Sequence, residues 1–360
     1  MARSAVVNPK SRWRVVTRRA LCRLAIFAIV VLVAGVWGYF VMIRMPGKSF
    51  EGPPPPLTAE QAQLRDELRG HVRALAGEIG PRNVAHPKSL ARAEEYLAET
   101  LRTMGHEVRR QTYEAEGVPC SNLIAEVPGV EAGGAMVIVG AHYDTCWTTP
   151  GADDNTSAVA ATLALARRFA RTRPQRTLRF VLFVNEEPPF FRTRRMGSLV
   201  YARHCAASNE RIAAMICLEM LGYYSDGAGS QRYPLPGLGL AYPRRGDFIG
   251  FVSNLRSRRL LRDVIGAFRR HADIPSEGAA LPGWAPGVGL SDHWSFWKAG
   301  YADRAIMVTD TAMFRNPNYH RPSDTPDTLD YARMARVVTG LEAVVRALAE
   351  AGPGRDERND

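Results

Sequence analysis

The sequence predicts an α/β fold: a three-layer sandwich with a mixed, mostly parallel central sheet covered by helices, preceded by one N-terminal transmembrane helix. Short apolar runs rich in β-branched residues alternate with helical runs through most of the chain, as in parallel sheets. Acidic residues and histidines directly follow several of these runs, where open α/β sheets place ligands. By length, the 360 residues form one large domain or two small ones, and 46% apolar residues are ordinary for a folded chain.

The net charge of +11 comes mostly from the N-terminal tail. Residues 1–50 hold nine of the 47 Lys and Arg and none of the 36 Asp and Glu. The remainder therefore carries 38 basic against 36 acidic residues and is almost neutral. Because a nucleic-acid-binding domain needs a basic face of its own, we expect no nucleic-acid partner.

Residues 24–43 are 20 consecutive residues without a charge, the length that crosses a bilayer with about 30 Å of hydrocarbon. Seven Lys and Arg precede this segment, which predicts a basic cytoplasmic tail over 1–23 and a domain outside the cell membrane, in the periplasm or the exterior. A cleaved signal peptide is the alternative. It fits less well, because the apolar run is long and no small-x-small site clearly ends it. We therefore expect a single-pass signal anchor.

A linker and two helices precede the alternating units. The run of four prolines at 53–56 predicts a stiff, extended linker over 44–57, followed by the folded domain at 58–351 and a disordered tail at 352–360. Thr58-Ala59-Glu60-Gln61 is a capping box that opens a helix. A second helix is expected at 89–104, and strands at 107–114 and 122–127.

The alternating units then run to the C-terminus. Further strands are expected at 136–139, 178–184, 213–218, 248–253 and 305–308. Further helices are expected at 157–171, 198–205, 258–271 and 327–350. Two Gly- and Pro-rich stretches, 225–246 and 275–290, are predicted as long loops, which often form functional rims or lids.

Acidic residues and histidines follow four of these strands. In chain order they are His142 and Asp144, Asp153 and Asp154, Glu186 and Glu187, Glu219, and finally His320. The carboxyl ends of parallel strands share one edge of a sheet, so residues distant in sequence can converge there. Two histidines and three carboxylates suit a pair of zinc ions with one bridging carboxylate, whereas hard, oxygen-only metals would not need the imidazoles.

The ordered motifs GAHYDT, GADDN, NEE, LEM, SDH and YHRPSD resemble the co-catalytic di-zinc aminopeptidases, zinc exopeptidases of the bacterial leucyl aminopeptidase type. The resemblance covers roughly residues 58–350. It implies two Zn²⁺ per chain, one bound by His142 and Glu219, the other by Glu187 and His320, with Asp154 bridging both. It also implies that Glu186 is the general base and that Asp144 orients the ligand histidine, fixing its tautomer.

This sequence departs from the family pattern at Glu219, where the best-known members carry Asp. The extra methylene still allows coordination, but it could change the metal affinity or the distance between the metals. The stretch 188–195 is longer than the corresponding stretch in the simplest members of the family, and we expect it to shape substrate access. Asp292 and His293 are candidates for contact with the substrate or for support of the ligands.

The resemblance implies hydrolysis of peptide substrates from their N-terminus by a metal-activated water. Two alternatives stay open. Glutaminyl cyclases share the fold and similar HYD and EE motifs but typically use one zinc, whereas retention of His142, His320 and GADDN favours two metals and hydrolysis. A non-catalytic binding module on this fold would usually lack the ligands, and this chain has all five.

Four cysteines lie in the predicted domain, at Cys120, Cys146, Cys205 and Cys217, and none has CxxC spacing. Buried free thiols are therefore expected, with one disulfide as the alternative in an oxidising compartment.

Overall fold

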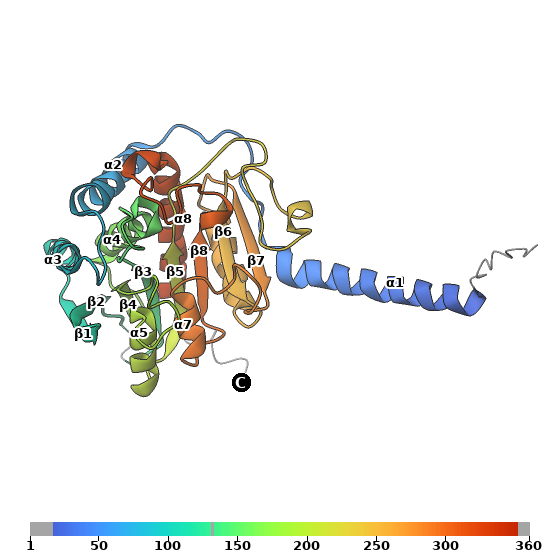
Figure 1. Cartoon of the computed structure of the whole chain (residues 1–360), viewed down its shortest axis with the longest axis horizontal. Coiled ribbons are helices and arrows are strands. Elements are labelled where there is room, and N and C mark those ends of the chain that lie inside the picture. The colour runs from blue at the N-terminus through green and yellow to red at the C-terminus, as the bar shows by residue number, and fades with distance from the viewer. Residues whose placement is uncertain (1–16, 131–132, 352–360) are drawn as a thin grey trace, which may run out of the picture. The chain divides into compact units, whose positions relative to one another are not determined.

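The computed structural model describes residues 17–130 and 133–351, which are drawn as ribbons in Figure 1. The chain divides into two compact units between Val41 and Met42. The first unit contains α1 (Arg18–Gly38), whose helical path continues to Ile43. This 26-residue segment is long and apolar enough to cross a membrane and includes the predicted span 24–43. Thr17 caps it by accepting the Ala20 N–H at 3.3 Å. The predicted tail 352–360 and most of the predicted basic tail lie outside the described residues.

The second unit is built on one mixed eight-stranded sheet in the order β1-β2-β4-β3-β5-β8-β6-β7. Its strands are β1 (Val108–Ala115), β2 (Val118–Val127), β3 (Met136–His142), β4 (Leu178–Phe183), β5 (Ile212–Glu219), β6 (Ile249–Asn254), β7 (Ser276–Leu281) and β8 (Ala305–Thr309). The four central strands β4, β3, β5 and β8 are mutually parallel. Antiparallel pairing of β2 with β4 and of β6 with β8 makes the sheet mixed.

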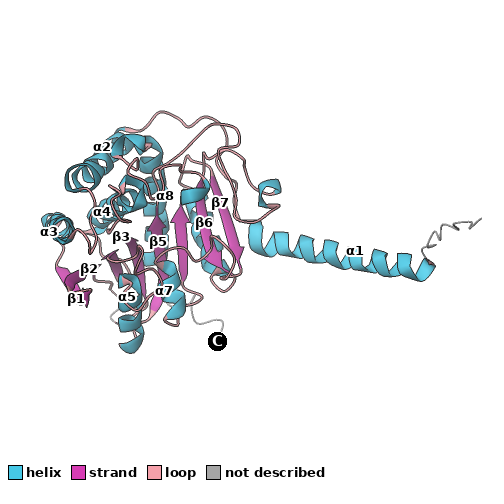
Figure 2. Cartoon of the chain, viewed as in Figure 1, coloured by secondary structure: helices cyan, strands magenta, loops and turns pink. Residues whose placement is uncertain are grey.

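Helices cover both faces of this sheet, as Figure 2 shows. They are α2 (Ala59–Val72), α3 (Pro87–Thr103), α4 (Ala158–Phe169), α5 (Gly197–Ala207), α6 (Arg258–Arg269), α7 (His293–Lys298) and α8 (Tyr331–Ala349). Alternate residues of β3 point to opposite faces: Val139 packs in the core beneath α2, α4, α6 and α8, and Ile138 packs in the core beneath α5 and α7. The predicted three-layer α/β sandwich is confirmed.

Most predicted elements lie within a few residues of their expected bounds, but two predictions were wrong. The stretch 275–290 is not all loop, because β7 pairs in parallel with β6 at the edge of the sheet. Its sequence, SEGAAL, has no β-branched residue, so pairing with a neighbour rather than intrinsic propensity makes it a strand. The closing helix starts at Tyr331 rather than near 327, because Asp330 caps it by accepting the Arg333 N–H at 2.9 Å. The short helix α7 was not predicted.

The predicted linker 44–57 is extended, but much of it lies against the domain. Met45 is buried, and an added Cβ on Gly278 of β7 would meet the Met45 side chain at 2.7 Å. Ser49 Oγ accepts the Ser276 N–H at 2.8 Å, and Arg336 of α8 donates to the Pro55 carbonyl. A truncation that removes residues 44–50 would therefore expose part of the core edge.

Candidate metal centre and active site

The predicted ligands converge at the carboxyl edge of the central strands. His142 is the last residue of β3 and Glu219 the last of β5, while Glu186 and Glu187 follow the end of β4. His320 reaches the same place from the loop between β8 and α8. The topology thus gathers residues separated by almost 180 positions, because β4, β3, β5 and β8 run in parallel.

The side chains form two groups that share Asp154. Oδ1 of Asp154 lies 3.4 Å from His142 Nε2, and Oδ2 lies 3.1 Å from His320 Nε2. Glu219 Oε2 is 3.5 Å from His142 Nε2, and Glu187 Oε2 is 3.1 Å from His320 Nε2. We call His142 with Glu219 the first subsite and His320 with Glu187 the second subsite.

Several polar atoms that face these subsites are buried without a hydrogen bond. Within the described residues, His142 Nε2, His320 Nε2 and Glu187 Oε1 have no hydrogen-bond partner. An unpaired buried polar atom costs free energy, and a coordinated cation would remove that cost. Imidazole nitrogens beside three carboxylates form a donor set that zinc accepts readily, so these residues fit a zinc pair.

Asp144 ties the two strands that carry most of the centre. Its carboxylate accepts the N–H of Glu186 and the N–H of Glu187, both at 3.1 Å. His142 Nδ1 lies 3.2 Å from the Asp144 carbonyl and 3.5 Å from its carboxylate. A partner at Nδ1 leaves Nε2 directed at the shared Asp154, which is how a ligand imidazole is oriented.

A second carboxylate, Asp324, fixes the main chain on which Asp154 sits. It accepts the N–H of Asp153 at 2.9 Å and the N–H of Asp154 at 3.1 Å. The neighbouring Asn155 accepts the Met220 N–H at 2.9 Å, which links this turn to the end of β5. Asp154 is therefore held from both sides of the centre.

The chain also matches known proteins. Residues 122–345 match the sequence profile described as Peptidase family M28. The chain belongs to this family of zinc metallopeptidases. It is 39% identical over 284 residues to the uncharacterized protein YfbL of Escherichia coli, which covers 77% of this chain and 86% of that protein. It is 31% identical to leupeptin-inactivating enzyme 1 of Streptomyces exfoliatus over 144 residues, 39% of this chain and 32% of that one.

Solved structures share the fold of this M28 peptidase at low sequence identity. The aminopeptidase LapA of Legionella pneumophila has a TM-score of 0.62 at 17% identity and covers 84% of this chain and 78% of its own. The zinc aminopeptidase BSAP of Bacillus subtilis has a TM-score of 0.62 at 15% identity, and the match covers 80% of this chain and 95% of BSAP. A glutaminyl cyclase of Porphyromonas gingivalis has a TM-score of 0.59 at 20% identity, and the match covers 78% of this chain and 97% of the cyclase.

Burial and charge set the protonation of the M28 centre. Burial raises the pKa of Glu186 and of Glu187 well above the usual value for a glutamate, although the nearby His142 opposes this shift. Burial also raises the pKa of Asp154, but its electrostatic interactions with the nearby imidazoles of His142 and His320 outweigh burial and hold this pKa below its usual value. Glu186 Oε2 lies 3.8 Å from His142 Nε2, so this protonatable carboxylate faces the first subsite.

Asp292 and His293 lie at the start of α7 and are fully buried. Burial raises the pKa of Asp292 to about 7 and lowers that of His293 to about 4. His293 Nε2 donates to the Val288 carbonyl at 2.7 Å. The preceding Ser291 makes the direct link to the centre by donating to Glu219 Oε2 at 2.5 Å. The predicted role of Asp292 and His293, contact with the substrate or support of the ligands, stays a prediction.

Two further residues of the site were not singled out in the sequence. The Arg82 guanidinium is fully buried and donates to the carbonyls of Tyr143 at 2.6 Å and Pro150 at 2.7 Å, which pins the loop after β3. No local pattern marks this arginine, which lies 60 residues before His142. Cys146 lies beside the second subsite. Its only signal was its place two residues after Asp144.

An apolar pocket of about 110 Å³ opens beside the centre. Glu219 and Tyr319 line it on the side of the metal centre. Apolar side chains form its walls, among them Phe251, Val252, Leu281, Val288, Met307 and Phe314. Residues of the predicted loops 225–246 and 275–290 contribute to its lining, so these stretches form part of the rim.

Proposed function

We propose that this M28 peptidase is a membrane-anchored aminopeptidase that uses two zinc ions to hydrolyse N-terminal residues from peptides. The observation that carries the proposal is the position of Asp154, which presents one carboxylate oxygen to each histidine. In this proposal His142 and Glu219 would hold one ion, His320 and Glu187 would hold the other, and Asp154 would serve both. Bound together, two such ions lower the pKa of water and polarise a peptide carbonyl.

Glu186 is the proposed general base. Burial raises the pKa of Glu186 above that of an exposed glutamate. A raised pKa makes a carboxylate a stronger base, which favours proton transfer from water near pH 7. It would accept a proton from the attacking water and deliver one to the leaving amine. Asp144 holds the main chain of Glu186 in place through the Glu186 N–H, so the base is positioned by the same carboxylate that contacts His142.

The apolar pocket supports a preference for substrates with an apolar N-terminal side chain. Its volume of about 110 Å³ suits one side chain rather than an extended peptide, and it shares Glu219 with the centre. In this proposal the free α-amino group of the substrate lies beside the metal centre. An amino group fixed beside the metals and a side chain fixed in the pocket would select the first peptide bond.

The test is the zinc content of the purified full chain in detergent, measured alongside a panel of aminoacyl and N-terminal glutamine substrates. We expect two zinc ions per chain and release of apolar N-terminal residues. One zinc ion with ring closure of glutamine would instead assign a glutaminyl cyclase, whose fold this chain shares. No metal and no turnover would leave a binding module.

Replacing the base separates chemistry from metal binding. Glu186→Gln should lower the rate of hydrolysis by about 10²- to 10⁴-fold, the usual contribution of general acid–base catalysis, with zinc content unchanged. Glu60→Gln, a change at an exposed residue of α2, is the matched control. Full activity of Glu186→Gln would contradict the proposed mechanism.

We also propose that the N-terminus is cytoplasmic and the domain periplasmic or extracellular. The seven basic residues before the apolar segment support this orientation. Protease added outside intact cells or spheroplasts should digest the domain. Protection of the domain until the membrane is dissolved would contradict the orientation.

A further inference from the structure

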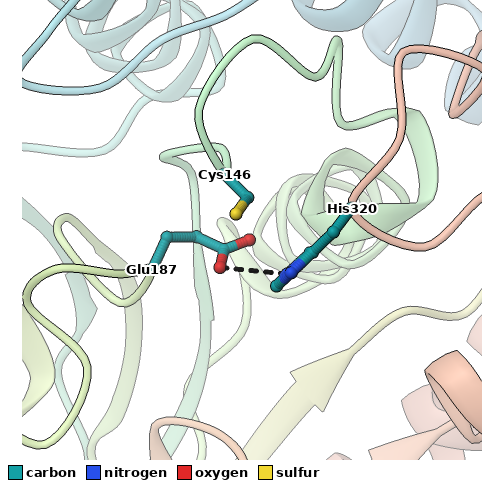
Figure 3. Close-up of side chains that lie close together, drawn as sticks. All are labelled: Cys146, Glu187 and His320. Atoms are coloured by element: carbon teal, nitrogen blue, oxygen red, sulfur yellow. Dashed lines mark ion pairs between the residues drawn. The ribbon is translucent and has the colours of Figure 1, made fainter.

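Three side chains of different chemistry meet at the second subsite. Cys146 Sγ, a carboxylate oxygen of Glu187 and a ring nitrogen of His320 lie within 4.8 Å of one another. Figure 3 shows the thiol directed toward the space between the carboxylate and the imidazole ring. Among the described residues, no other cysteine joins a cluster of this kind.

The loop that carries Cys146 is held firmly on both sides of the thiol. The Asn83 side-chain amide donates to the Thr145 carbonyl at 2.8 Å and to the Trp147 carbonyl at 2.7 Å. The Cys146 carbonyl accepts the N–H of Thr149 at 3.0 Å and its hydroxyl at 2.9 Å. The residues before and after Cys146 are thus fixed, and the thiol has a defined place at the subsite.

The neighbours of Cys146 point independently to a ligand in this space. Glu187 is buried, and its Oε1 has no hydrogen-bond partner in the part of the chain that the structure describes. His320 Nε2 is also buried without a hydrogen bond. Two unpaired polar atoms and a thiol facing one another are expected where a cation binds and are costly elsewhere.

We propose that Cys146 is a further ligand of the metal ion at the second subsite, completing a set with Asp154, Glu187 and His320. This inference rests on the proposed function, because it assumes that a metal binds there. On binding, the S–H bond breaks, the sulfur–metal bond forms, and the proton leaves to solvent. A bound metal ion lowers the pKa of a coordinating thiol and so would drive this deprotonation.

The proposal gives the two subsites different tasks. Closed zinc sites have four protein ligands, whereas catalytic sites have three and keep one position open. With Cys146 the second subsite has four protein ligands, and the first subsite has three: His142, Glu219 and the shared Asp154. Glu186 faces the first subsite. The open position therefore lies next to the proposed base, and the second ion is held by a soft ligand that favours zinc over magnesium or manganese.

X-ray absorption at the zinc edge tests this on the unmodified full chain loaded with two zinc ions. Zinc–sulfur bonds of about 2.3 Å differ from zinc–nitrogen and zinc–oxygen bonds of about 2.0–2.2 Å. We expect one sulfur neighbour for every two zinc ions. A shell of nitrogen and oxygen alone, with two zinc ions bound, would overturn the inference and leave the aminopeptidase proposal standing. A chain that binds no metal would remove both.

Variants of the thiol give a second measurement. In the cobalt-loaded chain we expect a thiolate-to-cobalt charge-transfer band in the near ultraviolet that Cys146→Ser abolishes. Cys205→Ser, a change at a buried cysteine of α5, should retain the band. We also expect Cys146→Ser to weaken binding of the second metal by roughly 10- to 100-fold, the scale seen for residues that support metal ligands. A band that persists in Cys146→Ser would overturn the inference.

Discussion

The two subsites are built from different kinds of structure. In the first, His142 and Glu219 are the last residues of two central strands and pair with Phe183 and Thr309 in the sheet. In the second, Glu187 lies four residues beyond β4, and His320 lies in a long loop with a left-handed backbone φ of 56°. The His142 side chain is 1% exposed and that of His320 is 22% exposed.

This difference shows how each ligand is fixed. A residue at a strand end inherits its position from ladder hydrogen bonds that the fold makes in any case. A loop residue needs contacts of its own. The His320 ring stacks on the Tyr319 ring with 3.8 Å between the ring centroids, and it packs edge-on against the Trp147 ring with 6.3 Å between the centroids. A non-glycine residue at positive φ is also strained, and such strain persists only where surrounding contacts hold it. The second subsite therefore forms only when several loops pack correctly.

The largest expected effect comes from removing each histidine in turn. His142→Gln and His320→Gln should each bind one zinc ion instead of two. Because a metal supplies several kcal/mol of transition-state stabilisation, we expect His142→Gln to lower kcat/KM by on the order of 10³-fold. His320→Gln should cost less, since Glu186 faces the first subsite. The measurements are zinc content and peptide hydrolysis.

The exposed His271 provides the control for this pair, because His271→Gln should change neither zinc content nor rate. Equal losses in His142→Gln and His320→Gln would contradict the division of tasks between the two subsites.

A smaller effect is expected from the carboxylate that holds the shared ligand. Asp324 accepts two main-chain N–H groups at Asp153 and Asp154, and an asparagine would keep only one acceptor oxygen. Asp324→Asn should weaken zinc binding at both subsites by about 10- to 100-fold. Competition with a chelator measures both affinities. Asp327→Asn, an exposed neighbour, is the control, and a loss confined to one subsite would show that Asp154 is not shared.

The same contrast explains how much the sequence could predict. The residues proposed as ligands follow strands whose apolar runs are easy to recognise, and the parallel order of those strands brings them to one edge. His320 lies 11 residues beyond the end of β8, so the strand pattern linked it to this edge of the sheet less directly. The fold class was predictable because the alternation of strands and helices is a local signal that repeats along the chain. The observed sheet and the two cores on its faces confirm that prediction.

Features that depend on distant partners were not predictable in this way. β7 becomes a strand because β6 lies beside it, although none of its own residues is β-branched or aromatic. The buried Arg82 donates to carbonyls 61 and 68 positions away in the sequence, and no spacing rule marks such a residue. Cys146 carried no motif of its own, and its position beside Glu187 and His320 exists only in three dimensions.

The pH dependence of metal binding tests the second subsite more finely. Burial lowers the pKa of His320, but its electrostatic interactions with Asp154 and Cys146 outweigh burial and raise the pKa to about 10. An unfolded imidazole titrates near about 6.5. The bound proton therefore stabilises the metal-free fold fully below about pH 6.5, and this stabilisation is lost as the pH rises toward about 10.

Since a metal ion must displace this proton, the proton of His320 alone should make zinc affinity at the second subsite rise by up to about tenfold per pH unit across roughly pH 6 to 8, and the proton released by Cys146 would add to that slope. Chelator competition at several pH values measures the slope. In His320→Gln the slope assigned to this proton should disappear, and an affinity independent of pH in the native chain would contradict the expectation.

The smallest expected effect concerns Trp147, whose ring contacts His320 of the second subsite. Trp147 is 63% exposed, so Trp147→Ala should leave the fold intact while removing the ring from the edge of His320. Aromatic contacts of this kind contribute about 0.5–1.5 kcal/mol, so the second zinc ion should bind about two- to tenfold more weakly. Trp284→Ala, at a tryptophan that is 85% exposed, is the control. Because Trp147 contacts a loop ligand and not a strand-end ligand, an equal change at the first subsite would mean that the two are positioned by one shared structure.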